Sequence, residues 1–332
     1  MSCCVSSSLF TLSYFISIFV RMKRLVVLLF LLGSIIPMTG QTIVELRKGA
    51  TTVRSKNLHD YDVQTKDARQ EREDSLKYAD NLKWAYNYLH SDSLAAAERL
   101  FRECLQLRPK APGNNILRRS LGQIALAQGR YREAIETFTE VLRLNPSDHG
   151  ARMDRATVYL QDNNPQACIT DCDLLMPAAQ TDSLRERLYF LRGAAHLQNR
   201  QYSNARNDLE KVLSFNPSNT NAPILLAMTL EKEGRPKEAL QRISIYINAH
   251  PEDLNALLYR IHLEEEQQNF PSLRNDYDQA LRLAPDNREL YVGRAGVLIQ
   301  QKDFGAARRD LDKAVSLGMP RAALRELYKQ LQ

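Results

Sequence analysis

The chain has 332 residues, of which 44% are hydrophobic and 25% are charged. These fractions are typical of a folded globular protein and exclude a chain that is disordered throughout. The formal net charge is +6, but Arg21, Lys23 and Arg24 supply three of those charges in an N-terminal segment that has no acid. The other 42 basic and 39 acidic residues nearly balance. That surplus is too small and too dispersed to form a nucleic-acid-binding surface.

Residues 1–40 have the pattern of an export signal that begins at Met22. Lys23 and Arg24 form a basic start, and the apolar run 25–37 follows. This run has 13 residues, whereas a membrane-spanning helix needs about 20. We therefore expect a cleaved signal and an exported protein, either periplasmic or associated with the outer envelope. An uncleaved N-terminal anchor is the alternative.

Residues 41–77 are rich in charge and show no clear pattern before about Asp67. They are too few to form a further domain with its own core. We expect a loosely ordered segment that leads into the first helix.

A helical unit recurs along the rest of the chain. Residues 129–148 (GRYREAIETFTEVLRLNPSD) share their plan with 200–219 and 234–253. Each has a small residue, a bulky one four residues later and an apolar one three residues after that, which is the spacing of one helix face. Most units end in proline, which cannot continue a helix. A second helical pattern precedes each unit, so the sequence predicts an all-α array of helix–turn–helix units.

This pattern resembles the tetratricopeptide repeat (TPR), a 34-residue helix–turn–helix unit. The resemblance covers residues 78–321 and implies a right-handed superhelical solenoid. Residues 322–332 are predicted to form an amphipathic capping helix, because a terminal repeat needs a polar-backed cover. With the closing proline at repeat position 32, the seven repeats begin at residues 78, 115, 149, 186, 220, 254 and 288.

Two cysteines in the third repeat look reactive in isolation. Cys168 and Cys172 lie in the stretch ACITDCD, but they occupy repeat positions 20 and 24, where the other repeats mostly place alanine and a bulky apolar residue. The two cysteines lie one helical turn apart on one face, which is poor geometry for a disulfide. A metal site would need further ligands. We interpret both as buried packing residues and predict no metal or cofactor.

Arginine at position 7 and aspartate at position 23 occur together. One residue is on the first helix of a repeat and the other is on the second, near the helix crossing. We predict structural ion pairs rather than ligand sites, because bidentate Arg–carboxylate pairs commonly satisfy each other at partly buried seams. The predicted pairs are Arg155–Asp171, Arg192–Asp208, Arg260–Asp276 and Arg294–Asp310.

The resemblance also implies an inner surface, lined by positions 2, 5, 9, 12 and 13 of the first helices. Its middle is apolar and rich in methionine, which suits an amphipathic helix or an extended apolar segment of a partner. The alternative is that these side chains only fill the interior. No Lys–Asn clamp for a C-terminal carboxylate is present. The candidate groove residues are Arg119, Gln123, Met153, Thr157, Phe190, Ile224, Met228, Leu258 and His262.

The sequence carries no Gly-rich phosphate loop, no His-Glu-x-x-His and no Gly-x-Ser-x-Gly. We therefore predict no enzyme activity and no small-molecule substrate. The favoured function is a scaffold of the cell envelope that binds a protein or peptide partner in its groove, with possible association with envelope complexes. The alternative is a structural envelope protein that self-assembles.

Overall fold

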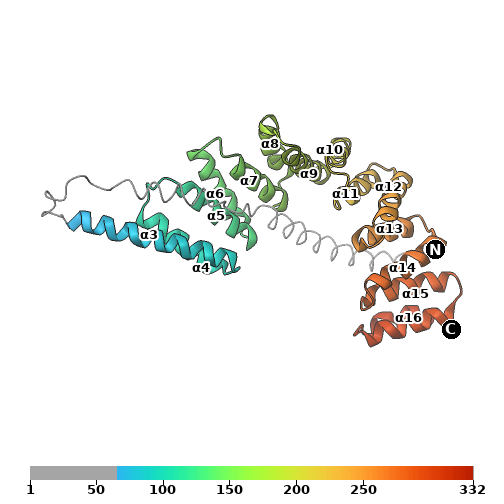
Figure 1. The fold of residues 1–332 in the computed structure, drawn as a ribbon. Coiled ribbons are helices and arrows are strands. Elements are labelled where there is room, and N and C mark those ends of the chain that lie inside the picture. The colour runs from blue at the N-terminus through green and yellow to red at the C-terminus, as the bar shows by residue number, and fades with distance from the viewer. Residues whose placement is uncertain (1–65, 332) are drawn as a thin grey trace. The chain divides into compact units, whose positions relative to one another are not determined.

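The computed structural model of the protein describes residues 66–331 (Figure 1). The predicted signal at 1–40 and residues 41–65 lie outside the described residues. Within the described range the secondary structure is α-helical, with two short 3₁₀ segments and no strand. The predicted all-α solenoid of helical repeats is therefore confirmed.

The described part of the chain divides into two compact units, with the division between Leu175 and Met176. In the described part of the first unit each helix packs on the next one along the chain. Its helices are α3 (Lys66–His90), α4 (Leu94–Leu107), α5 (Asn114–Ala127), α6 (Tyr131–Leu144), α7 (His149–Gln161) and α8 (Pro165–Leu175).

The second unit repeats the arrangement of antiparallel helix pairs. Its first helices also contact one another, α9 with α11 and α11 with α13. After the 3₁₀ turn η1 (Met176–Ala178) come α9 (Asp182–Gln198), α10 (Tyr202–Phe215), α11 (Ala222–Lys232), α12 (Pro236–Ala249), α13 (Leu254–Glu266), α14 (Phe270–Leu283), α15 (Arg288–Gln300), α16 (Phe304–Ser316), η2 (Arg321–Leu324) and α17 (Arg325–Lys329).

Small residues allow the two helices of a pair to cross closely. Ala85, Ala97 and Ala134 are fully buried at positions 8 and 20. At Gly122, also position 8, a Cβ atom would lie 2.6–3.0 Å from the ring of Phe138. The glycine is therefore required for the large position-24 side chain to fit between the helices.

The first helix starts earlier than the sequence pattern predicts. Residues 66–77 belong to α3, so the predicted loose segment is wrong over this stretch. The segment is rich in Lys, Arg, Glu, Gln and Ala, which are good helix formers. The amide of Gln70 donates to Asp74 at 2.8 Å, an i,i+4 contact that supports an exposed helix. Tyr78, one turn further on, is already buried in the core.

The sixth repeat accommodates bulk at the positions where the others have small residues. Ile261 and Leu273 are both buried there. The neighbouring Tyr277 donates its hydroxyl to Glu265 at 2.6 Å. Its phenol lies against Gly293 of α15, where a Cβ atom would lie 2.2 Å from the hydroxyl oxygen and 2.4–2.5 Å from two ring carbons. Gly293, in the next helix, thus leaves room for the side chain of Tyr277.

The end of the chain differs from the predicted continuous helix. Residues 321–324 form the 3₁₀ turn η2, and only 325–329 are α-helical. Leu324 is 1% exposed and packs on the last helix pair, with Leu327 partly buried beside it. The free energy gained by burying Leu324 against α15 and α16 is greater than that of continuing a regular helix. The last pair is therefore covered by a turn followed by a short helix.

Candidate partner-binding surfaces

The four Arg–Asp pairs are in bidentate contact. In each, Nε and Nη2 of the arginine donate to the two carboxylate oxygens of the aspartate, and every aspartate is buried. The geometry is that of paired, charge-assisted hydrogen bonds. The two donor–acceptor distances are 2.8 and 2.8 Å in Arg155–Asp171, 2.8 and 2.8 Å in Arg192–Asp208, 2.7 and 2.6 Å in Arg260–Asp276, and 2.7 and 2.8 Å in Arg294–Asp310.

Two of these arginines also contact the preceding repeat. Nη1 of Arg155 donates to the hydroxyl of Thr139 at 3.0 Å, and Nη1 of Arg294 donates to Asp278 at 2.6 Å. Hydrogen bonding to Asp310 raises the pKa of Arg294, so its charge is permanent. Each of these two arginines therefore links three helices, which is a structural role.

The predicted groove is only partly available to a partner. Met153, Thr157, Phe190 and Ile224 are all buried, with Phe190 only 8% exposed. The helices that carry these side chains contact a neighbouring first helix, α7 with α5 and α9 with α11. These four candidate groove residues lie in the interior, which is the alternative that the sequence left open for them.

In the first unit, the two predicted polar groove residues bind within the protein. Nε of Arg119 and the amide of Gln123, both on α5, donate to Asp154 of α7 at 2.7 and 2.8 Å. The guanidinium of Arg119 lies over Gly150, where a Cβ atom would approach it to 2.1 Å. These contacts join the first helices of two successive repeats.

The second unit has a related polar link between α11 and α13. The hydroxyl of Tyr259 donates to Glu231 at 2.6 Å, and Nε2 of His262 lies 3.8 Å from the same carboxylate. Burial would raise the pKa of Glu231, but hydrogen bonds from Lys232 and Tyr259 outweigh it and lower that pKa. Burial lowers the pKa of His262 below its usual range, and the nearby Glu231 opposes the shift.

An accessible apolar strip remains in the second unit, and we call it the inner strip. It comprises Met228 of α11, Leu258 of α13 and Val292 of α15, which are partly exposed. It also includes Gly296 of α15, around which a Cβ atom would meet nothing within 4 Å. His262 of α13, at repeat position 9, is also partly exposed. The arrangement provides apolar contact area with open space at Gly296, and no pair of groups suited to acid–base chemistry was identified among these residues.

The cysteines of ACITDCD lie in the core. Cys168 and Cys172 are fully buried on α8, and neither is in a disulfide. Across residues 66–331, no group of three or more His, Cys, Asp and Glu side chains could hold a metal ion. Nor is any helix in that range both long and apolar enough to cross a membrane.

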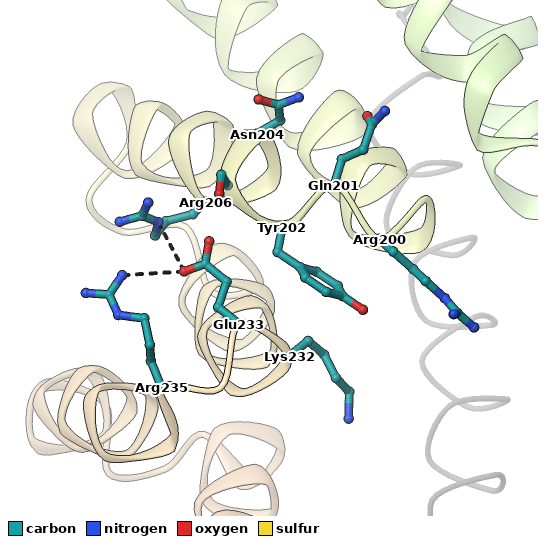
Figure 2. Close-up of a pocket in the computed structure, with 9 residues that line it drawn as sticks. Arg200, Gln201, Tyr202, Asn204, Arg206, Lys232, Glu233 and Arg235 are labelled. Atoms are coloured by element: carbon teal, nitrogen blue, oxygen red, sulfur yellow. Dashed lines mark hydrogen bonds and ion pairs between the residues drawn. The ribbon is translucent and has the colours of Figure 1, made fainter.

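A further depression, which we call the turn pocket, was not predicted. It has a volume of about 670 Å³ and lies in the second unit between the start of α10 and the α11–α12 turn (Figure 2). The sequence does contain its signal: Arg206 at position 21 and Arg235 at position 16 of the next repeat place two like charges at neighbouring turns. Its basic lining residues are Arg200, Arg206, Lys232 and Arg235.

Comparison with known proteins agrees with this architecture. Over 95 residues the chain is 33% identical to RNA polymerase II-associated protein 3 of Mus musculus, a match that covers 29% of this chain and 14% of that protein. The matches to curated relatives span at most 23% of those proteins' lengths.

Two solved structures are similar in fold. A tetratricopeptide repeat protein from Parabacteroides merdae has a TM-score of 0.59 at 22% identity, over 77% of this chain and 99% of that one. The pilF protein of Pseudomonas aeruginosa has a TM-score of 0.50 at 16% identity, over 64% of this chain and 94% of that one.

Stacked antiparallel helix pairs with small residues at each crossing define an α-solenoid repeat protein. Patterns characteristic of the tetratricopeptide repeat match residues 119–167, 196–260 and 260–322, more than half of the chain. The chain therefore belongs to the tetratricopeptide repeat proteins, a family of generally non-enzymatic scaffolds that mediate protein–protein interaction.

Proposed function

We propose that this protein is a scaffold that binds a protein or peptide partner through the inner strip of its second unit. Its membership of the tetratricopeptide repeat proteins carries the proposal, because the scaffolds of this family generally act by binding other proteins. The accessible apolar side chains of the inner strip support it, since apolar patches that remain exposed commonly mark interaction sites.

The chemistry of the inner strip favours an apolar segment of the partner. Met228 and Leu258 offer flexible apolar contact, and methionine adapts to irregular surfaces. Gly296 leaves open space that a partner side chain can fill. An amphipathic helix laid along the strip would place its apolar face on these residues and its polar face in water.

Photo-crosslinking tests this function. We would replace Met228 with a benzophenone amino acid, and Arg309 on the exposed face of α16 as the matched control. In cell-envelope extracts of the source organism, the residue-228 probe should give a discrete adduct that the residue-309 probe does not. The substitution Gly296→Arg should abolish it by filling the open space. Identical adduct patterns at both positions would contradict the proposal.

We further propose that the protein acts in the cell envelope after export. The basic Lys23-Arg24 start and the apolar run 25–37 support this location. Expression with a periplasmic fractionation, followed by N-terminal sequencing, tests it. A mature chain that begins near residue 41 in the exported fraction is the expected result. An intact Met1 or Met22 would exclude cleavage and favour the N-terminal anchor.

Self-assembly is the second candidate function, and α3 provides the observation that favours it. Leu76 and Trp84 are 61% and 53% exposed, and the Trp84 ring lies 6.3 Å from that of Tyr88. These side chains share one face of α3, where two copies of the chain could bury them together. Sedimentation at rising concentration should show an oligomer that Trp84→Glu disperses. A monomer at all concentrations would exclude this alternative.

A further inference from the structure

The turn pocket is a cationic depression that the inner strip does not include. Its nine lining residues contain four basic side chains and one acid, Glu233. Figure 2 shows Glu233 between Arg206 and Arg235, with Tyr202 separating this cluster from Arg200. Oε2 of Glu233 lies 3.4 Å from Nε of Arg206 and 3.4 Å from Nη1 of Arg235. Glu233 thus pairs with both guanidinium groups, while Arg235 is also ion-paired with Glu238 of α12 and Lys232 with Glu231 at 2.6 Å.

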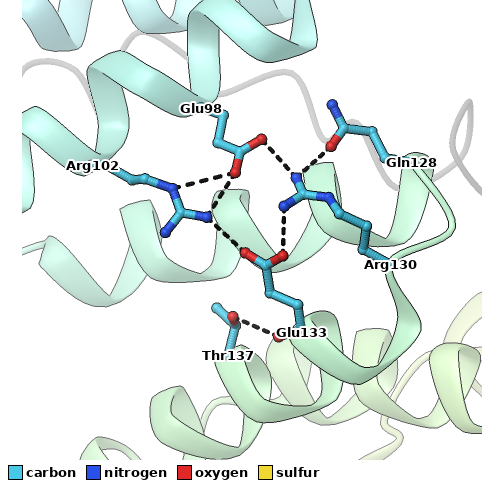
Figure 3. A network of polar contacts seen from close by, with 6 residues as sticks. All are labelled: Glu98, Arg102, Gln128, Arg130, Glu133 and Thr137. Atoms are coloured by element: carbon cyan, nitrogen blue, oxygen red, sulfur yellow. Dashed lines mark hydrogen bonds and ion pairs between the residues drawn. The ribbon is translucent and has the colours of Figure 1, made fainter.

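The equivalent turns of the first two repeats are closed by alternating charges (Figure 3). Glu98 of α4, at position 21, accepts from Arg102 at 2.7 Å and from Arg130 at 2.6 Å. Glu133 accepts from the same two arginines. Two glutamates and two arginines therefore satisfy one another, and Arg130, at position 16, is fully engaged.

Three changes of charge distinguish the turn pocket from that closed ring, because position 25 also changes from Arg102 to Glu210 and position 14 of the following repeat changes from Gln128 to Glu233. Position 21 is Glu98 in the first repeat but Arg206 in the fourth, while position 16 of the following repeat is arginine in both cases. In the sixth repeat the position-21 residue, Arg274, faces an acid at position 16, with 3.8 Å between its Nη1 and Asp303. Of these three turns, only the one at Arg206 and Arg235 sets arginine against arginine. Glu233 is the acid that pairs with both of these arginines.

The pocket also holds an unused donor. Nε of Arg206 is shielded from water and has no hydrogen-bond acceptor, because its geometry to Glu233 does not make a hydrogen bond. A buried donor without an acceptor is costly, and a ligand oxygen would relieve that cost. Arg200, on the other side of Tyr202, has no ion pair in the described structure and is exposed.

We propose that the turn pocket binds an acidic segment of a protein partner, with neighbouring glutamate or aspartate side chains as the ligands. Carboxylates fit guanidinium groups bidentately. The basic groups are spread on both sides of Tyr202 rather than converging on one point, which suits several carboxylates on a chain better than one small anion. The volume of about 670 Å³ lies within the usual range for ligand sites. This site goes beyond the proposed inner-strip function and does not depend on it.

The test is binding of fluorescein-labelled hexaglutamate to the full chain, followed by fluorescence anisotropy at moderate salt. Arg206→Glu reverses the charge of one lining residue and leaves Arg235 paired with Glu233 and Glu238. Loss of one charge-assisted contact is worth about 1.5–3 kcal/mol, so affinity should fall at least about tenfold. Arg309→Glu is the matched control, because it makes the same charge change at an exposed site on α16. It should alter affinity less than about twofold.

Three results would overturn the proposal. The first is no saturable binding of hexaglutamate to the unmodified protein. The second is an equal loss with Arg206→Glu and Arg309→Glu, which would show diffuse attraction only. The third is displacement by inorganic phosphate at concentrations matched to the peptide, which would show a site for a single anion. Thermal unfolding of each variant checks the fold. Crosslinking from residue 228 is measured separately, so failure here leaves the inner-strip test intact.

Discussion

The pair between positions 7 and 23 sets the register of the two helices in four repeats. Each aspartate is buried at the crossing, so an unpaired carboxylate there would carry a large desolvation cost. The pair itself adds little net stability, because both groups lose hydration. Its effect is to penalise any packing of the two helices that separates arginine from aspartate.

A double-mutant cycle at Arg260 and Asp276 measures this effect. Removing either partner alone should destabilise the protein by about 3–5 kcal/mol, because the other charge is left buried and unpaired. The double variant Arg260→Ala/Asp276→Ala should lose less than the sum of the two. Urea unfolding followed by circular dichroism gives the free energies. Additive losses would show that the contact does not couple the two residues.

Glu264 gives a pH dependence that can be predicted in sign. This residue of α13 is 5% exposed, and its Oε2 has no hydrogen-bond partner in the described structure. Burial and the negative charge of Asp276 raise the pKa of Glu264 from 4.5 to about 7, partly opposed by Arg260. The folded state therefore holds the proton more tightly than the unfolded state. Its stabilising contribution is complete below pH 4.5 and is lost as pH rises through about 7.

The substitution Glu264→Gln removes that dependence. A shift of this size corresponds to about 1–3 kcal/mol. The free energy of unfolding of the variant should therefore exceed that of the unmodified protein by this amount at pH 8, and the two should be equal at pH 4.5. The measurement is the difference in free energy of unfolding between the two proteins at each pH, since other acids titrate equally in both. A difference that does not change with pH would exclude Glu264 as its source.

At the scale of the helix pair, the turn between the two helices has one recurring strained position. Repeat position 15 has a positive φ in all seven described turns. Glycine adopts this conformation freely, whereas other residues pay about 1 kcal/mol. The position-15 residues are Asp92, Gly129, Asn163, Arg200, Gly234, Gln268 and Lys302.

Matched glycine substitutions at two turns separate stability from binding. Arg200→Gly and Lys302→Gly should each raise the free energy of unfolding by up to about 1 kcal/mol, because both residues have φ near +60°. Arg200 lines the turn pocket and Lys302 does not. Arg200→Gly should therefore weaken hexaglutamate binding while Lys302→Gly leaves it unchanged. Equal binding by both variants would remove Arg200 from the site.

The helix pairs show which features the sequence could predict. The contact of Arg155 with Asp171 follows from a fixed offset of 16 residues inside one repeat, so a single repeat is enough to predict it. The burial of Phe190 depends on how closely α9 and α11 approach, which no pattern within one repeat determines. The turn pocket likewise needs two adjacent repeats, since it arises from Arg206 facing Arg235.

At the scale of the whole chain, packing is between neighbours in sequence. Within the described part of each unit, the major contacts join helices that are one or two apart along the chain. Such an array gains stability repeat by repeat, through interfaces between adjacent units. A local defect should therefore destabilise mainly the helices next to it. In a globular domain with one central core it would destabilise the whole domain.

A cavity in the last helix pair tests this locality. Leu311 of α16 is fully buried, and Leu311→Ala should cost the surrounding core about 2–5 kcal/mol. Hydrogen exchange followed by mass spectrometry should show faster exchange in α15, α16 and the turn η2, where Leu324 loses its packing partner. Helices α9 and α10 of the same unit should exchange at their original rates, because the main contacts of α15 and α16 are with each other and with α14. Uniform acceleration along the chain would show a single cooperative fold instead of an array stabilised pair by pair.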